Sequence, residues 1–87
     1  MQTHATAHAF VRADQRLPFS ATEDDFRAVV DDIVAVLSGE ARACVLLRRC
    51  PDGKEVWLAR MRGHSVRVVY APETAGVITV IVDMRQC

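Results

Sequence analysis

The stretch HAFVRADQR, residues 8–16, carries one histidine and two arginines at a spacing that suits chemistry on an anion. His8, Arg12 and Arg16 stand four residues apart, and side chains at that interval are neighbours on the surface of a helix. Arginine holds phosphate through a planar fork of donors, and imidazole exchanges a proton near neutral pH. The spacing therefore predicts an anion clamp with a proton carrier at one end. The same residues also fit a solvated helix face with weak surface ion pairs.

The charges of the chain balance overall but are divided along it. There are 11 basic and 11 acidic residues, and ten of the basic ones are arginine. Residues 23–40 hold six acids and one base, whereas residues 42–70 hold seven bases and two acids, a net of five positive charges. This division favours an anionic ligand on one face, with RNA as the leading candidate. Arginines at alternate strand positions also fit a solvated sheet face.

Length and composition predict one globular domain over residues 1–87. The chain is 51% hydrophobic and 25% charged, and a chain of 87 residues is long enough to bury a core. We see no secretory signal and no apolar run near the roughly 18 residues of a membrane span, so we expect a cytoplasmic protein without a membrane partner. An odd number of cysteines (Cys44, Cys50 and Cys87) is a poor disulfide framework. Cys44, within an apolar run, is expected to be buried.

A metal site is not expected. His4 and His8 are four residues apart, but the chain lacks paired-cysteine spacing and the glutamate of the metalloprotease helix motif. We therefore predict no metal and no cofactor.

The first helix is expected over residues 3–16. Thr3 is a suitable capping residue at its start. Pro18 stops it, because the residue before a proline is pushed out of helical geometry.

The second helix is expected over residues 22–38. Ser20 and Glu23 have the spacing of a capping box, and Gly39 stands where a left-handed cap belongs. Apolar residues recur at intervals of three and four, so we expect them to lie against a sheet, with Asp24, Asp31 and Asp32 facing water. This apolar stripe consists of Phe26, Val29, Val30, Ile33 and Leu37.

After the second helix, the hydrophobic period changes to two, which is typical of strands. Turn residues such as PDGK separate the segments, and loops this short force neighbouring strands to be antiparallel. The fold class predicted is therefore α+β, with two N-terminal helices packed on a four-stranded antiparallel β-meander. The four strands are expected within residues 41–50, 55–62, 64–70 and 77–84.

The motif His-Ala-x-x-Arg-x-x-x-Arg on a helix, an acidic amphipathic helix, and strands containing RVVY and VITVI resemble the RelE/ParE-type toxin superfamily. The likeness is to its barnase/EndoU/RelE-like ribonuclease branch and covers nearly the whole chain. It implies that polar residues of the helix and of the late strands meet in one cleft. The candidate catalytic residues are His8, Arg12, Arg16, Tyr70 and Thr79, and the candidate substrate-binding residues are Arg60 and Arg67.

RNA cleavage without a metal needs a base for the ribose 2′-hydroxyl, a cation for the charge at phosphorus and an acid for the leaving oxygen. His8 and the arginines supply such groups, so we expect a metal-independent endoribonuclease of toxin type. The partners expected are RNA and a cognate antitoxin or immunity protein. The alternative is a non-catalytic binding or inhibitory module on the same fold, such as a gyrase-poison-like toxin or a phage protein, since fold alone does not decide activity.

Some candidates also have plain structural readings. Thr79 alternates with Val77 and Ile81, as a strand filler would. His64 stands beside a glycine in a tight turn, and Trp57 fits a core position better than a surface for stacking bases.

Overall fold

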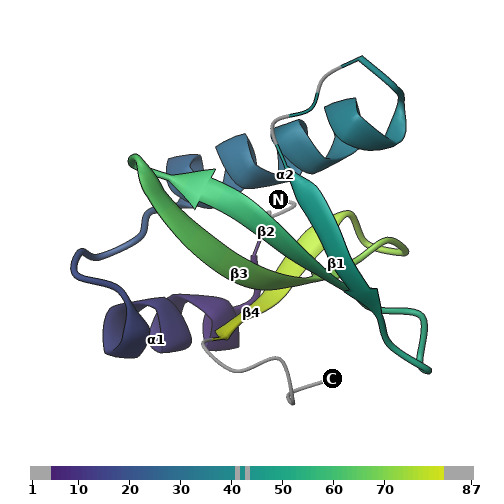
Figure 1. Ribbon diagram of the computed structural model, residues 1–87. Coiled ribbons are helices and arrows are strands. Elements are labelled where there is room, and N and C mark those ends of the chain that lie inside the picture. The colour runs from purple at the N-terminus through teal and green to yellow at the C-terminus, as the bar shows by residue number, and fades with distance from the viewer. Residues whose placement is uncertain (1–4, 41, 43, 82–87) are drawn as a thin grey trace.

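The computed structural model describes residues 5–40, 42 and 44–81, which form two helices and then one antiparallel sheet of four strands (Figure 1). The strands lie in the order β1-β2-β3-β4, and each is paired with the next in the sequence. The α+β fold predicted from the sequence is therefore confirmed. The elements are α1 (Ala7–Arg16), α2 (Glu23–Leu37), β1 (Val45–Arg49), β2 (Glu55–Met61), β3 (His64–Ala71) and β4 (Gly76–Ile81).

Helix α1 begins later than predicted. Its N-cap is Thr6, whose hydroxyl accepts a hydrogen bond from the backbone N–H of Ala9. The cap predicted at Thr3 lies outside the described residues. Leu17 is extended, as expected for the residue before Pro18, so the predicted end of the helix is confirmed.

Helix α2 has the predicted type of cap on a different pair of residues. The capping box joins Thr22 and Asp25, and the prediction of Ser20 and Glu23 was wrong. Both pairs have the required spacing of three residues, and Asp25 also accepts a hydrogen bond from Arg62 in the turn between β2 and β3. Past the end of the helix, Gly39 takes the expected left-handed conformation with a φ of 76°.

The main core lies between the helices and one face of the sheet, with α1 against β4 and α2 mainly against β2 (Figure 1). Trp57 is 1% exposed there, which confirms its predicted core position. Leu37 was expected in the core, but it is 53% exposed, because the last turn of α2 reaches past the sheet. The other members of the apolar stripe of α2, namely Phe26, Val29, Val30 and Ile33, are buried as predicted.

A smaller apolar cluster lies on the opposite face of the sheet. It contains Cys50, Val56, Val69 and Ile81, with Ile78 beside it. Cys50 is disulfide-bonded, contrary to the expectation from the odd number of cysteines. Cys44 is free and buried, as predicted.

A bulge in β4 changes which side chains share a face. Val69 pairs with Thr79, but the next residue of β3, Tyr70, pairs with Val77, so Ile78 is an extra residue. Val77 therefore joins the main core, whereas Thr79 lies on the opposite face with the smaller cluster. Because Val77, Thr79 and Ile81 alternate regularly in the sequence, the sequence did not indicate the bulge or that Val77 and Thr79 face opposite sides of the sheet.

No helix in the described part of the chain is long and apolar enough to cross a membrane.

Candidate functional site

The seam between α1 and the outer edge of β4 is held by contacts to backbone carbonyls. The backbone N–H of Thr6 donates to the carbonyl of Val77 at 3.0 Å, and its hydroxyl donates to the carbonyl of Ile78 at 2.7 Å. At the other end of α1, the guanidinium of Arg16 donates to the carbonyl of Val80. These bonds cover an edge that would otherwise expose unpaired carbonyls, and they fix α1 along β4.

The His8, Arg12 and Arg16 ladder turns around α1 rather than running straight along it. An interval of four residues exceeds one helical turn by about 40°, so each member is rotated toward the face that carries the buried Ala9 and Ala13. His8 is accordingly exposed, and the two arginines are half-buried. Arg16 has turned far enough to reach β4, and its guanidinium fastens the helix to the strand.

His8 and Arg12 form a pair on the exposed rim of α1. The Nε of Arg12 donates to Nε2 of His8 at 3.4 Å, and its Nη1 donates to Oε1 of Gln15 at 2.9 Å. An accepting Nε2 means that a neutral His8 carries its proton on Nδ1. The imidazole thus places a nitrogen that can accept a proton next to a cation that can bind a phosphate.

Arg60, Arg67 and Thr79 share the face of the sheet opposite the helices. Arg67 stands opposite Leu58 on the neighbouring strand, so Arg60, two residues along β2, is its diagonal neighbour, about 7–8 Å away between backbones. Thr79 has the same diagonal relation to Arg67 across β3 and β4, because it pairs with Val69. Arg60 and Arg67 are exposed and Thr79 is half-buried. The structure therefore brings these three residues onto one face, with Thr79 on β4, the strand that α1 flanks.

Tyr70 does not join this group. It is 2% exposed and belongs to the main core on the helix side of the sheet. Burial, together with the nearby charge of Glu55, raises the pKa of the Tyr70 hydroxyl. Glu55 itself is 8% exposed and accepts a hydrogen bond from Nε1 of Trp57 at 3.1 Å. Glu55 and Tyr70 are paired across β2 and β3, and this pairing brings Glu55, Trp57 and Tyr70 together in the core. The sequence analysis did not predict this buried group.

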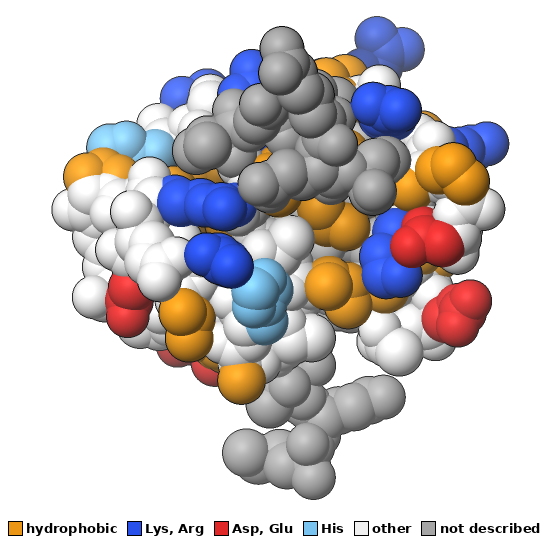
Figure 2. All heavy atoms as spheres, turned by 90° about the horizontal axis from the view of Figure 1, so that it is seen from below, with side chains coloured by type: hydrophobic (Ala, Val, Ile, Leu, Met, Phe, Trp, Pro, Cys, Tyr) orange, Lys and Arg blue, Asp and Glu red, His pale blue; other side chains and the backbone are white. Residues whose placement is uncertain are grey.

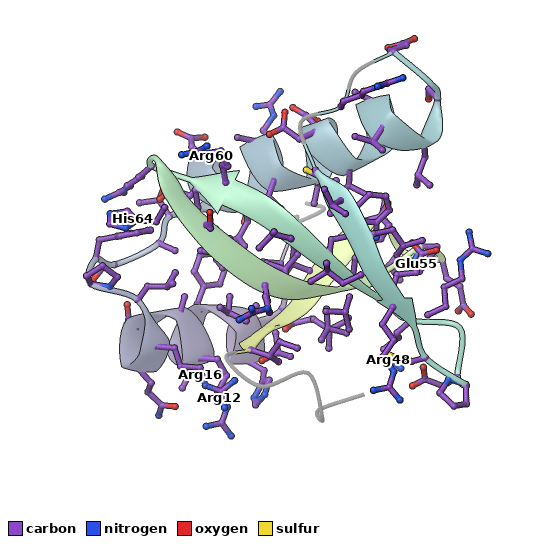
Figure 3. All side chains as sticks on the ribbon, in the orientation of Figure 1. Arg12, Arg16, Arg48, Glu55, Arg60 and His64 are labelled. Atoms are coloured by element: carbon purple, nitrogen blue, oxygen red, sulfur yellow. The ribbon has the colours of Figure 1, made fainter. Side chains whose placement is uncertain are left out.

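The basic groups are spread over the surface rather than gathered in one pocket. Figure 2 shows Lys and Arg side chains around a histidine over the face seen from below, with acidic side chains toward its margins. In Figure 3, Arg12 and Arg16 lie along α1, Arg60 lies at one end of the sheet, and Arg48 lies toward the other. Two surface hollows in the described part of the chain lie elsewhere, between the β1–β2 and β3–β4 turns and after α2.

Sequence reasoning also missed two contacts of the site. Gln15 holds Arg12 in place, and its position three residues along the helix was the available signal. Phe19, which follows α1, contacts Arg62 of the β2–β3 turn and His64 at the start of β3, and no local pattern joins these segments.

Among the described residues, no group of three or more His, Cys, Asp and Glu side chains is placed to hold a metal ion. Comparison of the chain with protein-family models, with curated proteins and with solved structures found no match. The resemblance to the RelE/ParE-type superfamily therefore stays a prediction.

Proposed function

We propose that this protein binds RNA along the α1–β4 seam and the adjoining face of the sheet, and cleaves it as a metal-independent endoribonuclease of toxin type. The observation that carries the proposal is the His8–Arg12 pair, in which a basic imidazole nitrogen lies 3.4 Å from a guanidinium nitrogen on the exposed rim of α1. Arg67 and Thr79, on the sheet beyond that rim, support it as further groups for the phosphate.

The mechanism begins with the exchange of one hydrogen bond for a stronger one. A phosphate draws Arg12 away from the neutral imidazole, because a bond in which both the donor and the acceptor are charged is stronger than a bond from the same cation to a neutral nitrogen. Nε2 of His8 then accepts the proton of the ribose 2′-hydroxyl, whose oxygen attacks phosphorus. Arg12 and Arg67 neutralise the charge that develops there. The 5′-oxygen leaves and takes a proton from solvent, and the other product ends in a 2′,3′-cyclic phosphate.

The other candidate residues have more distant roles in this proposal. Arg16 positions α1 through its bond to the Val80 carbonyl, and Tyr70 supports the core. The Thr79 hydroxyl, which donates to the carbonyl of Val80 at 3.4 Å, orients the phosphate. Arg60 contacts a phosphate outside the reacting bond.

The test is cleavage of a single-stranded RNA by the purified protein and by His8→Ala. General acid–base catalysis is typically worth about 10²–10⁴-fold, so the variant should lose activity by about that factor. Val11→Ala, an exposed change on the same helix, should cleave at the parental rate. Activity should persist in chelator and produce cyclic phosphate ends. A His8→Ala variant as active as the parent would remove His8 from the mechanism.

The proposed location is the cytoplasm, where RNA is found, and the proposed protein partner is a cognate antitoxin or immunity protein. A toxin-type ribonuclease acting in its own cell requires such a protein to restrain it. The disulfide at Cys50 is unusual for a reducing compartment, so cell fractions prepared under thiol-blocking conditions give the sharpest test of the location.

The second candidate is the non-catalytic, protein-binding module. It is favoured by the exposure of large apolar side chains, including Leu37 at 53% and Val45 at 55%. Induced expression in bacteria separates the two functions. Growth arrest that survives His8→Ala but is lost in Leu37→Asp would favour protein binding, and the reverse result would favour RNA cleavage.

A further inference from the structure

The turn between β2 and β3 holds a bulky residue in a conformation that favours glycine. Met61 pairs with His64, which leaves Arg62 and Gly63 as a two-residue loop with φ angles of 52° and 80°. Positive φ at both positions defines the type I′ turn that matches the twist of a hairpin. Glycine accepts this conformation freely, whereas a side chain such as that of Arg62 costs about 1 kcal/mol. Contacts of the arginine must offset that cost.

The side chain of Arg62 contacts two residues that are distant from it in the sequence. Its Nη2 lies 2.9 Å from a carboxylate oxygen of Asp25, and its Nε donates to the second oxygen at 3.1 Å. The guanidinium also lies over the ring of Phe19, 5.0 Å from the centroid. The strained turn therefore carries a planar cation to the loop between α1 and α2.

His64 meets the same phenylalanine. The ring centroids of His64 and Phe19 are 5.2 Å apart, and the rings are tilted by 38°. Phe19 is half-buried against the main core, which holds its ring in place. We name Phe19, Arg62 and His64 the stacking cluster, because it combines two aromatic rings and a guanidinium plane.

The outer part of the stacking cluster faces solvent. His64 is exposed, and the Arg62 side chain is 45% exposed. Arg60 lies beside them, since its Nη2 donates to the carbonyl of Gly63 at 3.3 Å. Figure 3 shows His64 and Arg60 at the same end of the sheet, away from Arg48. The planar groups and the Arg60 cation thus meet at the end of the hairpin, with Arg60 reaching it from the face of the sheet opposite the helices.

We propose that the stacking cluster binds an unpaired base of the RNA, a proposal that rests on the RNA binding proposed above. Unstacked bases bind to aromatic side chains and to guanidinium planes, and every base offers a face for such contact. The base lies on the outer face of His64, and Arg60 binds a flanking phosphate. The stacking cluster binds single-stranded segments of RNA with little preference for their sequence.

A purely structural role does not account for His64. The Arg62–Asp25 ion pair already joins the hairpin to α2 through two contacts. Within the described part of the chain, His64 makes the ring contact with Phe19 and no side-chain hydrogen bond. Its imidazole is therefore available to a ligand without loss of a bond that holds the fold.

The experiment measures binding of a single-stranded adenosine oligonucleotide to the full chain and to two variants. Stacking of one base is worth about 1–3 kcal/mol, so His64→Ala should weaken binding between about fivefold and 150-fold. His64→Phe keeps an aromatic face and should bind within about twofold of the parent. Inorganic polyphosphate, which has the phosphates and no bases, should bind the parent and His64→Ala equally. Thermal unfolding confirms that both variants are folded, as expected for an exposed residue.

Two results would overturn the stacking site alone. One is an unchanged affinity of His64→Ala for the oligonucleotide, and the other is an equal loss of oligonucleotide and polyphosphate binding. A parent protein that binds no RNA at low salt would overturn both this site and the proposed function.

Discussion

Asp25 connects the N-terminus of α2 to the β2–β3 turn, and its replacement by alanine measures how much this connection contributes to stability. Its carboxylate accepts hydrogen bonds from the backbone N–H of Thr22 at 2.8 Å and from Nε of Arg62 at 3.1 Å. Asp25→Ala removes the acidic half of the capping box and the ion-pair partner of Arg62, which is one of the two contacts that offset the cost of its positive φ. The stacking cluster also depends on this connection, because Arg62 belongs to it.

The size of the effect follows from the two kinds of contact. Loss of the bond from the backbone N–H of Thr22 to the Asp25 carboxylate costs about 1 kcal/mol, while the cap made by the Thr22 side chain remains. The ion pair is partly screened, since the Arg62 and Asp25 side chains are 45% and 15% exposed, and contributes about 0.5–1 kcal/mol. The free energy of unfolding should therefore fall by about 1.5–2 kcal/mol. For a chain of this size that lowers Tm by about 10 °C.

Thermal and urea unfolding measure this loss, with Asp24→Ala as the matched control. Asp24 is an exposed acid in the same first turn and should cost no more than about 0.5 kcal/mol through the helix dipole. In a double-mutant cycle, Asp25→Ala and Arg62→Gln should be coupled by about 0.5–1 kcal/mol. Equal losses in Asp24→Ala and Asp25→Ala, or no coupling, would refute the reasoning.

The same contact predicts a dependence of stability on pH. Partial burial acts to raise the pKa of Asp25, but hydrogen bonds from Arg62 and Thr22 hold it below its ordinary value of 3.8. A pKa lowered by folding contributes stability that is present above pH 3.8 and is lost as the pH falls through the folded-state pKa. Asp25→Ala should therefore differ from the parent at neutral pH and converge with it in acid.

Other predictions concern the proposed ligand and the free thiol. Arg67→Ala should lower the slope of log affinity for RNA against log salt by about one unit, as seen in a salt titration, whereas Arg27→Ala on α2 should leave it unchanged. Burial, with the charge of Asp32, raises the pKa of the Cys44 thiol to about 11. Native Cys44 should therefore react with a thiol reagent at pH 8 more than about a hundredfold slower than in denaturant, as peptide mapping would show.

Much of the fold could be predicted because its signals are local. The helical period of α2, the change to a period of two, and the short turns determine the element order and the antiparallel pairing. Gly39 ends α2 where a left-handed residue is needed, and Pro18 ends the preceding helix. In each case the physical cause acts within a few residues, so the sequence contains it.

The arrangement of the candidate site depended on contacts between distant segments. The spacing of Arg12 and Arg16 predicted equal roles for the two arginines. Because successive members of the ladder are rotated around α1 toward β4, Arg16 donates to the carbonyl of Val80, whereas Arg12 remains beside His8. A bulge in β4 decides the face of Thr79, because one extra residue reverses the alternation.

The tertiary structure also decides which side chains are buried and which rings meet. Tyr70 lies in the core because the helices cover its face of β3. Phe19 meets His64 because the loop between the helices packs against the end of the β2–β3 hairpin. Such contacts follow from how whole elements pack to bury apolar surface, and no short stretch of sequence encodes that packing by itself.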